Sequence, residues 1–381
     1  MKIRNINHLY LREWRLAAVV LLLSFLLVYT SRTLRLESGA AIAPPERSVL
    51  LIHDTVGLDE LIGLMEENGI GFQTDELRWA SGILGWRRFN QGRYELDGPM
   101  SYSDFFSKLA LGLQDPVPLR IPPGLTKERL RERISMQMQF DARELAEVMR
   151  DTSFLGSHDL EPHLVYGRIL PDTYEVYWTA SPQRLLERLF SEFETRVIRP
   201  HADKLQQLGR SVDEITTLAS IIEWEARFED EKRAISGVYW NRLNRRWRLQ
   251  ADPTVNYAKG ERSRLVYDDY RIDHPYNTYR VHGLPPGPIT NPTLSSIEAA
   301  LYPEDHNYMY MVATPDGRHA FSRTYAEHRR KSRQWTDWLR DQRRIKAEME
   351  REEMEREKAE REKLERNEPL QEEHGGSNEK P

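Results

Sequence analysis

The sequence predicts an α+β protein with a single N-terminal transmembrane helix and a charged C-terminal tail. Three observations support this prediction: an uncharged apolar run near the N-terminus, short strand and helix patterns that alternate from residue 48 onward, and a final stretch of Glu, Arg and Lys repeats. A chain of 381 residues has room for two or three domains, and one of them can bury a sizeable core.

The apolar run covers residues 16–30 and contains no charged side chain. As a helix it is about 23 Å long, short of a hydrocarbon core of about 30 Å. Arginines on both sides can extend their charges to the headgroups, and Trp14 and Tyr29 suit the membrane interface. A cleaved signal peptide is the alternative, but the Ala-x-Ala site at 41–43 lies well beyond the run. We therefore expect an uncleaved anchor.

The basic residues around this helix predict its orientation. Four basic residues precede it and two follow it closely, so the N-terminus is expected in the cytoplasm and the rest of the chain outside. The predicted parts are a cytoplasmic segment (1–15), the transmembrane helix (16–30) and a small-residue, Pro-rich linker (31–47).

Beyond the linker, strand patterns are followed by the apolar spacing of short helices. Strands are expected at 48–52, 92–96 and 117–121, and helices near 58–65, 103–113 and 130–138. Residues 184–247 are mostly helical in pattern. A mixed region follows, with a helix near 295–300, strands near 308–313 and 319–322, and a terminal helix. No glycine-rich phosphate loop is present in the sequence.

The net charge of −5 is concentrated in the tail, because residues 341–381 carry −4 and the rest of the chain only −1. A nearly neutral body argues against a general nucleic-acid binder, which would carry a basic patch or stripe. Glu precedes Arg at i,i+4 spacing three times in the tail, and each pair adds about 0.2–0.5 kcal/mol to a helix. We expect a solvated, partly helical extension that ends in disorder, without a coiled coil.

The absence of cysteine excludes several classes of chemistry. A thiol nucleophile, a thiolate zinc site, an iron–sulfur cluster and a disulfide framework all require it. The eleven histidines are scattered, and neither His-Glu-x-x-His nor Gly-x-Ser-x-Gly occurs. We therefore expect no metal site and no cofactor.

Two glutamates in the middle of the chain are candidates for acid–base chemistry. Residues 214–226 predict a helix with one apolar stripe, and Glu223 and Glu225 fall at opposite edges of that stripe. A carboxyl group beside an apolar face is partly desolvated, which raises its pKa toward the value that a general acid needs at neutral pH. The alternative is a pair of solvated glutamates, one of them paired with Arg227 or Lys232.

The sequence after this helix is rich in groups that suit sugars. Asp252 followed by a proline predicts a helix start with Asp252 as its N-cap. Residues 276–279 then place two tyrosines, an amide and a hydroxyl in a Pro-rich loop. Sugar C–H faces stack on flat rings, and sugar hydroxyls bond to amides and carboxylates. The alternative is an ordinary turn with buried tyrosines.

Six short motifs occur in order between residues 170 and 289. They are Leu170-Pro-Asp-Thr-Tyr174, Leu218-Ala-Ser-Ile-Ile-Glu-Trp-Glu225, Val238-x-x-Asn-Arg-Leu243, Leu249-Gln-x-Asp-Pro-Thr-Val255, Tyr276-Asn-Thr-Tyr279 and Gly283-Leu-Pro-Pro-Gly-x-Ile289. Together they resemble the endolytic murein transglycosylase (YceG-like) family, and the resemblance covers about residues 48–338. Two departures from the family pattern occur. The string Tyr166-Gly-Arg-Ile-Leu170, with Tyr166 and Arg168, stands where Glu-Gly-x-Leu-Phe is common, and Trp224 stands where Lys is common.

The resemblance implies a membrane-anchored enzyme that cuts glycan strands of nascent peptidoglycan internally and so ends strand elongation. The bond cut is the β-1,4 link between N-acetylmuramic acid and N-acetylglucosamine, and the product is a 1,6-anhydro sugar. The first glutamate of the pair, Glu223, is implied as the catalytic acid and then base, so one carboxylate suffices. The implied substrate-binding residues are Asn241, Gln250, Asp252, Tyr276, Asn277 and Tyr279.

The resemblance also implies a LysM-like subdomain (48–140) and a transglycosylase catalytic domain (141–340) outside the cytoplasmic (inner) membrane. The charged tail (341–381) is not covered by the family pattern. Expected partners are peptidoglycan strands and the peptidoglycan synthases (penicillin-binding proteins) of the elongation machinery. The alternative of another class is a non-catalytic, membrane-anchored scaffold that binds the cell wall. A lysozyme-like hydrolase is a third interpretation.

Overall fold

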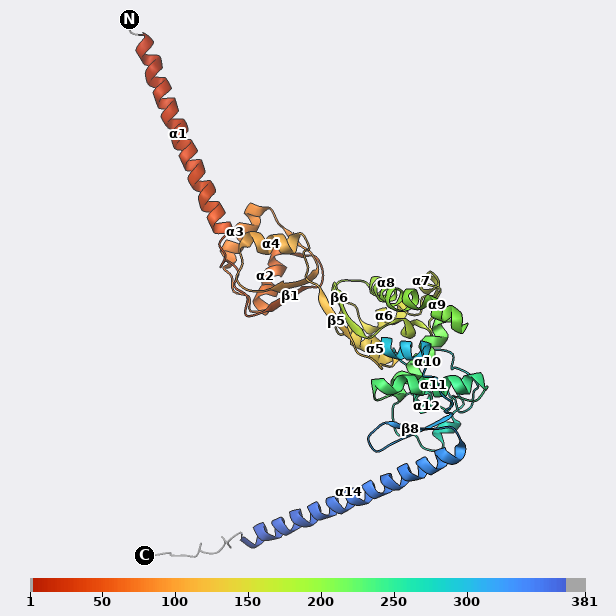
Figure 1. Cartoon of the computed structure of the whole chain (residues 1–381). Coiled ribbons are helices and arrows are strands. Elements are labelled where there is room, and N and C mark those ends of the chain that lie inside the picture. The colour runs from red at the N-terminus through yellow and green to blue at the C-terminus, as the bar shows by residue number, and fades with distance from the viewer. Residues whose placement is uncertain (1–2, 368–381) are drawn as a thin grey trace, which may run out of the picture. The chain divides into compact units, whose positions relative to one another are not determined.

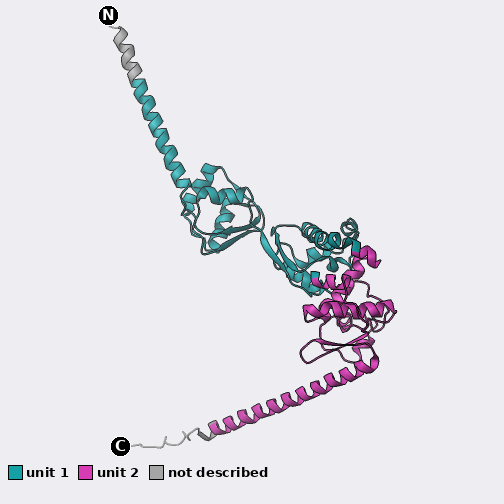
Figure 2. Ribbon diagram, viewed as in Figure 1, with its two compact units in different colours: residues 1–203, 290–294 teal, residues 204–289, 295–381 magenta. Residues whose placement is uncertain are grey.

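Residues 3–367 are described by the computed structural model, with side chains for residues 13–363, and many of the elements are labelled in Figure 1. The chain forms two compact units, which Figure 2 distinguishes by colour. Unit 1 contains residues 1–203 and 290–294, and unit 2 contains residues 204–289 and 295–381. Helices predominate, and the strands of the described residues form two-stranded antiparallel sheets. The prediction of a mixed helix and strand protein is confirmed.

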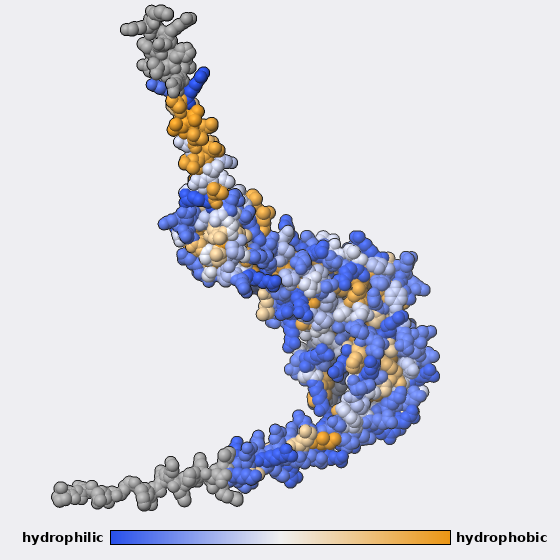
Figure 3. All heavy atoms as spheres, turned by 60° about the vertical axis from the view of Figure 1, so that its left-hand side comes forward, coloured by the Kyte–Doolittle hydropathy of each residue, from blue (hydrophilic) through white to orange (hydrophobic). Residues whose placement is uncertain are grey.

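Helix α1 (Ile3–Leu36) extends beyond the uncharged run on both sides. Its part Glu13–Leu36 is apolar enough to cross a membrane, and apolar side chains gather along it in Figure 3. These 24 residues are about 36 Å long, which exceeds a hydrocarbon core of about 30 Å. At the end of α1, Arg35 bonds both carboxylate oxygens of Glu76 at 2.6 and 2.7 Å and lies 3.9 Å from the centre of the Trp79 ring. The predicted N-terminal apolar helix is confirmed.

The first part of unit 1 packs helices against two small sheets. Two of the predicted strands occur at the expected residues, and Ser48 of one lies opposite Leu96 of the other. The predicted helix at 103 begins one residue earlier, because the Ser101 hydroxyl accepts a hydrogen bond from the backbone N–H of Asp104 at 3.0 Å. The elements are β1 (Ser48–Ile52), β2 (Val56–Gly57), α2 (Leu58–Glu67), α3 (Thr74–Leu84), β3 (Arg88–Phe89), β4 (Gly92–Leu96) and α4 (Tyr102–Ala110).

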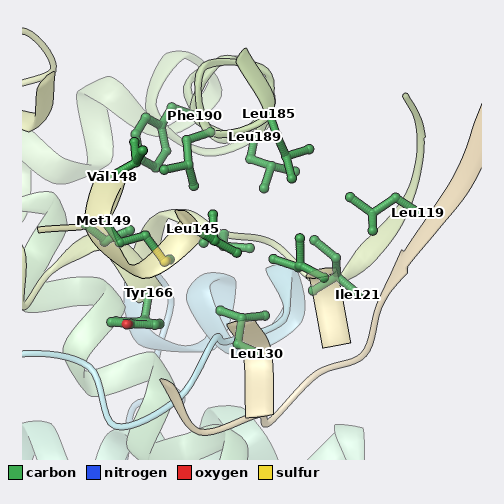
Figure 4. Packing of buried hydrophobic residues seen from close by; sticks show 14 of the residues in the cluster. Leu119, Ile121, Leu130, Leu145, Val148, Met149, Tyr166, Leu185, Leu189 and Phe190 are labelled. Carbon is green, nitrogen blue, oxygen red and sulfur yellow. The ribbon is translucent and has the colours of Figure 1, made fainter. Parts of the chain in front are cut away.

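The second part of unit 1 has its own hydrophobic core, which Figure 4 shows around Leu145 and Tyr166. This core draws buried side chains from Leu119 to Phe190, and the predicted boundary between residues 140 and 141 falls inside it. Strand β6 pairs antiparallel with β5. The elements are β5 (Val117–Ile121), α5 (Lys127–Ser135), α6 (Ala142–Val148), α7 (Thr152–Gly156), η1 (Val165–Arg168), β6 (Asp172–Val176), α8 (Pro182–Phe193), η2 (Glu194–Ile198) and α9 (Arg199–Leu208), whose residues from 204 onward belong to unit 2.

Unit 2 contains the helix with the two candidate glutamates, α10 (Val212–Glu225). Ser211 and Glu214 exchange hydrogen bonds at its start and form a capping box. The prediction of one apolar stripe is wrong, because every side chain of Ile215–Ile222 is buried, hydroxyl side chains included. The other elements are η3 (Glu229–Glu231), α11 (Lys232–Asn244), α12 (Asp252–Lys259), η4 (Asp269–Arg271), α13 (Leu294–Leu301), β7 (Tyr310–Ala313), β8 (His319–Ser322) and α14 (Tyr325–Asn367).

The C-terminal part of unit 2 is a hairpin followed by one long helix. Tyr310 of β7 lies opposite Ser322 of β8, so the first strand begins two residues later than the predicted 308. Helix α14 contains 43 residues, which confirms the helical nature of the tail. The disorder predicted for the end of the chain falls on residues 368–381, outside the described residues.

Candidate active site

Glu223 lies in a buried ion pair that joins three helices of unit 2. Its Oε2 accepts a hydrogen bond from the Ser296 hydroxyl of α13 at 2.6 Å and lies 3.5 Å from Nζ of Lys232 on α11. The Glu223 side chain is 11% exposed and that of Lys232 only 4%. Lys232 also donates to Glu229 at 2.7 Å and to the Ser295 hydroxyl at 2.9 Å. This environment places the carboxyl group of Glu223 beside a cation and braces α10 against its neighbours.

Glu225 lies at the end of α10, about 200° around the helix from Glu223, in a different environment. Burial raises the pKa of Glu225 to about 7, and the negative charge of Asp252 adds to the rise. Arg242, the hydroxyl of Tyr239 and Arg262 act in the opposite direction but do not cancel it. A carboxyl group with this pKa is substantially protonated at neutral pH, which is the state that a general acid requires.

Asp252 is held by two tyrosines rather than by the start of its own helix. The Tyr279 hydroxyl donates to Oδ1 at 2.6 Å and the Tyr270 hydroxyl to Oδ2 at 3.4 Å, while the two rings meet edge to face with centres 4.6 Å apart. The N-cap of α12 is Ala251, and no side chain caps it, so the prediction that Asp252 is the N-cap is wrong. Its carboxylate is engaged by the tyrosines and remains exposed to solvent.

These tyrosines are electrostatically coupled to the carboxylates. Burial raises the pKa of Tyr279 well above its ordinary range, and the charge of Asp252 raises it further. The same two causes raise the pKa of Tyr270 to about 12. Both hydroxyls therefore stay protonated at neutral pH and act as hydrogen-bond donors, which fixes the orientation of the Asp252 carboxylate.

Gln250 is the second expected binding residue with an exposed side chain. It has a left-handed backbone with φ of 49°, and its backbone N–H donates to Thr278 O at 3.2 Å. Because a non-glycine residue rarely adopts this conformation, the surrounding loop fixes it. Gln250, Asp252 and Tyr279 thus belong to adjoining segments, and their side chains remain at least partly accessible.

The other expected binding residues serve the loop and the helix rather than an open surface. Asn277 is fully buried, and its amide donates to Tyr270 O at 3.1 Å and to Ile272 O at 2.8 Å. Tyr276 is buried, with its ring centre 4.5 Å from that of Tyr257. Asn241 donates from Nδ2 to the backbone oxygens of residues 306 and 308 at 2.7 and 3.0 Å. These three side chains position the segments that carry the exposed groups.

Two residues of α11 were not among the expected site residues. Arg242 is buried, donates from Nε to Met309 O at 2.8 Å and from Nη1 to Leu249 O, and places its charge near Glu225. Tyr239 is fully buried and also faces Glu225. Arg242 belongs to one of the six motifs, and its place in that motif was the signal that could have identified it. Among the described residues, no group of three or more His, Asp and Glu side chains has the arrangement of a metal site.

Comparison with known proteins identifies the class. The sequence profile of the YceG-like family matches residues 50–334, and the chain therefore belongs to this family.

Three similar proteins illustrate the relationship. The endolytic murein transglycosylase of Bacillus subtilis (strain 168) is 29% identical over 287 residues, which are 70% of this chain and 79% of the relative. That of Streptococcus pneumoniae serotype 2 is 28% identical over 273 residues, 63% of this chain and 49% of the relative. A yceG-like protein from Listeria monocytogenes, known from a crystal structure, is 31% identical in sequence. The two structures superpose with a TM-score of 0.53, and the match covers 75% of this chain and 98% of that chain.

Proposed function

We propose that this protein is a lytic transglycosylase that cuts peptidoglycan glycan strands internally at the β-1,4 bond between N-acetylmuramic acid and N-acetylglucosamine. Membership of the YceG-like family and the names of its relatives support this assignment. The observation that carries it is the pairing of one carboxyl group of raised pKa, Glu225, with an exposed polar surface of Asp252 and Tyr279. This combination suits protonation of a sugar leaving group.

We propose Glu225, rather than Glu223, as the catalytic acid and base. Glu225 gives its proton to the glycosidic oxygen as the bond from that oxygen to C1 of the muramyl sugar breaks. The resulting carboxylate then takes the proton of the muramyl 6-hydroxyl, whose oxygen bonds to C1 and closes the 1,6-anhydro ring. The proton returns to Glu225, so the cycle needs no water and no second carboxylate nucleophile. Glu223 is less suited, because its Oε2 is engaged by a cation and a hydroxyl.

The exposed side chains around Glu225 are proposed to bind the sugars. Asp252, with its orientation fixed by Tyr279, accepts hydrogen bonds from sugar hydroxyls, and Gln250 offers both a donor and an acceptor. Asn241, Tyr276 and Asn277 are proposed to support this surface from behind.

The remaining proposals concern location and partners. Helix α1 anchors the enzyme in the cytoplasmic membrane as a single span, with the N-terminus inside and the catalytic part outside. The segment 48–140 is proposed to act as a LysM-like subdomain that contacts glycan. A synthase that extends the strand is the proposed partner, because cleavage of a nascent strand must follow its polymerisation.

The experiment compares two glutamate variants of the full-length protein in detergent. Wild type and Glu223→Gln are expected to produce 1,6-anhydromuramyl ends from purified peptidoglycan, and Glu225→Gln is expected to produce none. Thermal unfolding of each variant verifies that it is folded. If wild type binds peptidoglycan without producing new ends, the chain is a scaffold and the proposal fails. If Glu225→Gln retains activity while folded Glu223→Gln loses it, the acid is Glu223.

A further inference from the structure

A histidine of the C-terminal hairpin lies between two glutamates of unit 2. Nε2 of His319 is 3.8 Å from Oε1 of Glu225, and Nδ1 is 3.5 Å from Oε2 of Glu231. The His319 side chain is 11% exposed and that of Glu231 is 7% exposed. The three side chains come from β8, α10 and η3, and the mechanism above uses only one of them.

Glu231 is fixed against the histidine by the backbone. Its Oε1 accepts the backbone N–H of His319 at 2.7 Å. Within the described part of the chain, Oε2 of Glu231 and Nδ1 of His319 are both buried and have no hydrogen-bond partner elsewhere. Buried polar atoms are normally paired, so these two atoms, which face each other, form the natural pair after a small adjustment.

This arrangement determines the tautomer of a neutral His319. A carboxylate oxygen accepts only, so the imidazole hydrogen is favoured on Nδ1, where it points at Glu231. Nε2 is then left without a hydrogen and faces Glu225 as an acceptor. An acceptor in that place bonds to the protonated form of a carboxyl group and not to its anion.

We propose that Glu231 and His319 are positioning residues that hold Glu225 in its proton-carrying form, with the proton on Oε1. The proton passes from Oε1 to the glycosidic oxygen, and Oε2 is left to accept the proton of the muramyl 6-hydroxyl. This inference rests on the proposed role of Glu225. His319 itself exchanges no proton with the sugar, and the reaction is balanced without it.

The other groups around Glu225 include cations that favour its carboxylate form, and His319 must offset their effect. Asp252 of α12 favours the neutral acid, as burial does, whereas Tyr239 and Arg242 of α11 and Arg262, which follows α12, favour the carboxylate. Two cations therefore compete for the anionic form of the group that must carry a proton. A neutral acceptor at Nε2 counters them, and a donor at the same position would reinforce them.

Glu231→Gln in the full-length protein inverts this arrangement without changing size. The glutamine carbonyl keeps the backbone N–H of His319 as its donor, and its NH₂ then faces Nδ1. Nδ1 becomes an acceptor, the hydrogen moves to Nε2, and Nε2–H stabilises the carboxylate form of Glu225. The alkaline limb of the pH profile of kcat/KM is expected to move about one pH unit lower, giving roughly tenfold less activity at pH 8 and little change at pH 5.5.

The matched control is Asp230→Asn, which removes the neighbouring carboxylate of the same turn. Asp230 pairs with Arg318 at the surface at 2.9 Å, so its loss is expected to leave the pH profile unchanged. An alkaline limb that stays in place in folded Glu231→Gln, or that moves equally in the control, overturns the inference.

A second measurement does not depend on activity or on any variant of Glu231. Nitrogen NMR of wild type labelled in histidine, with the His319 signals assigned by their loss in His319→Gln, reports which ring nitrogen carries the hydrogen. Hydrogen on Nδ1 is expected, and hydrogen on Nε2 overturns the inference. If wild type produces no anhydromuramyl ends, the proposed function fails instead, and the tautomer still tests the geometry.

Discussion

The Glu223–Lys232 pair provides the most informative perturbation of the site. Glu223→Gln preserves the size of the side chain and a hydrogen bond with Ser296, but it removes the charge 3.5 Å from Nζ of Lys232. Removal of one partner from a buried ion pair typically costs about 3–5 kcal/mol, because the other charge is left buried. Lys232 keeps Glu229 at 2.7 Å and the Ser295 hydroxyl at 2.9 Å, so we expect a smaller loss of about 1–3 kcal/mol.

Thermal unfolding of the full-length protein measures this loss. For a unit of this size, 1 kcal/mol corresponds to about 2–4 °C, so the Tm of Glu223→Gln should fall by roughly 2–12 °C. Glu229→Gln is the matched control, because Glu229 is the other carboxylate partner of Lys232. The side chain of Glu229 is 69% exposed. Because the carboxylate of Glu229 is largely solvated, its loss is expected to cost about 1 kcal/mol or less, so the Tm of the control should fall by no more than about 4 °C.

The two roles of Glu223 give opposite combinations of stability and activity. If Glu223 braces the helices, the variant is less stable but still produces anhydromuramyl ends at 25 °C, within about threefold of wild type, because the folded population is retained. An unchanged Tm together with complete loss of product would refute the reasoning and return the catalytic role to Glu223.

Three further predictions concern the candidate active site and the tail. Because Glu225 must carry a proton and its pKa is about 7, initial rates should fall as pH rises through about 7, and a flat profile from pH 6 to 8.5 would contradict this. Tyr279→Phe removes a 2.6 Å hydrogen bond to Asp252 and should lower kcat/KM about tenfold. Tyr270→Phe removes a longer bond of 3.4 Å and should have a smaller effect. Equal losses in the two variants would contradict the greater importance of the Tyr279 hydrogen bond. A chain that ends at Arg340 should keep its activity, since the described side chains beyond it are exposed, and lost product formation would assign a role to the tail.

The local strands and helices could be predicted because their patterns are set by nearby residues. The apolar run in Ser48–Ile52 and the alternation in Gly92–Leu96 match the bounds of the observed strands. Strand β6 (Asp172–Val176) was not predicted, because its alternation of buried and exposed side chains is limited to Tyr174, Glu175 and Val176. It forms by pairing with β5, about 50 residues earlier in the chain. The stability of such a strand comes from its partner and is absent from its own sequence.

The choice between the two glutamates could not be made from the helical pattern. Both lie at edges of the predicted stripe, and the environments that distinguish them come from distant segments. Ser296 of α13 engages Glu223, whereas Asp252 of α12 and His319 of β8 face Glu225. Burial of α10 on all sides also removes the exposed face on which a solvated glutamate would lie. The sequence identified the pair, and only the tertiary contacts separate a bracing carboxylate from an acidic one.

Product analysis in ¹⁸O-labelled water tests the central claim most directly. Full-length wild type and Glu225→Gln are incubated with peptidoglycan near pH 6, and new muramyl ends are examined by mass spectrometry. Intramolecular ring closure predicts 1,6-anhydro ends without ¹⁸O from wild type and none from Glu225→Gln. Reducing ends that carry ¹⁸O would contradict the account, because they would show that water, rather than the muramyl 6-hydroxyl, attacks C1.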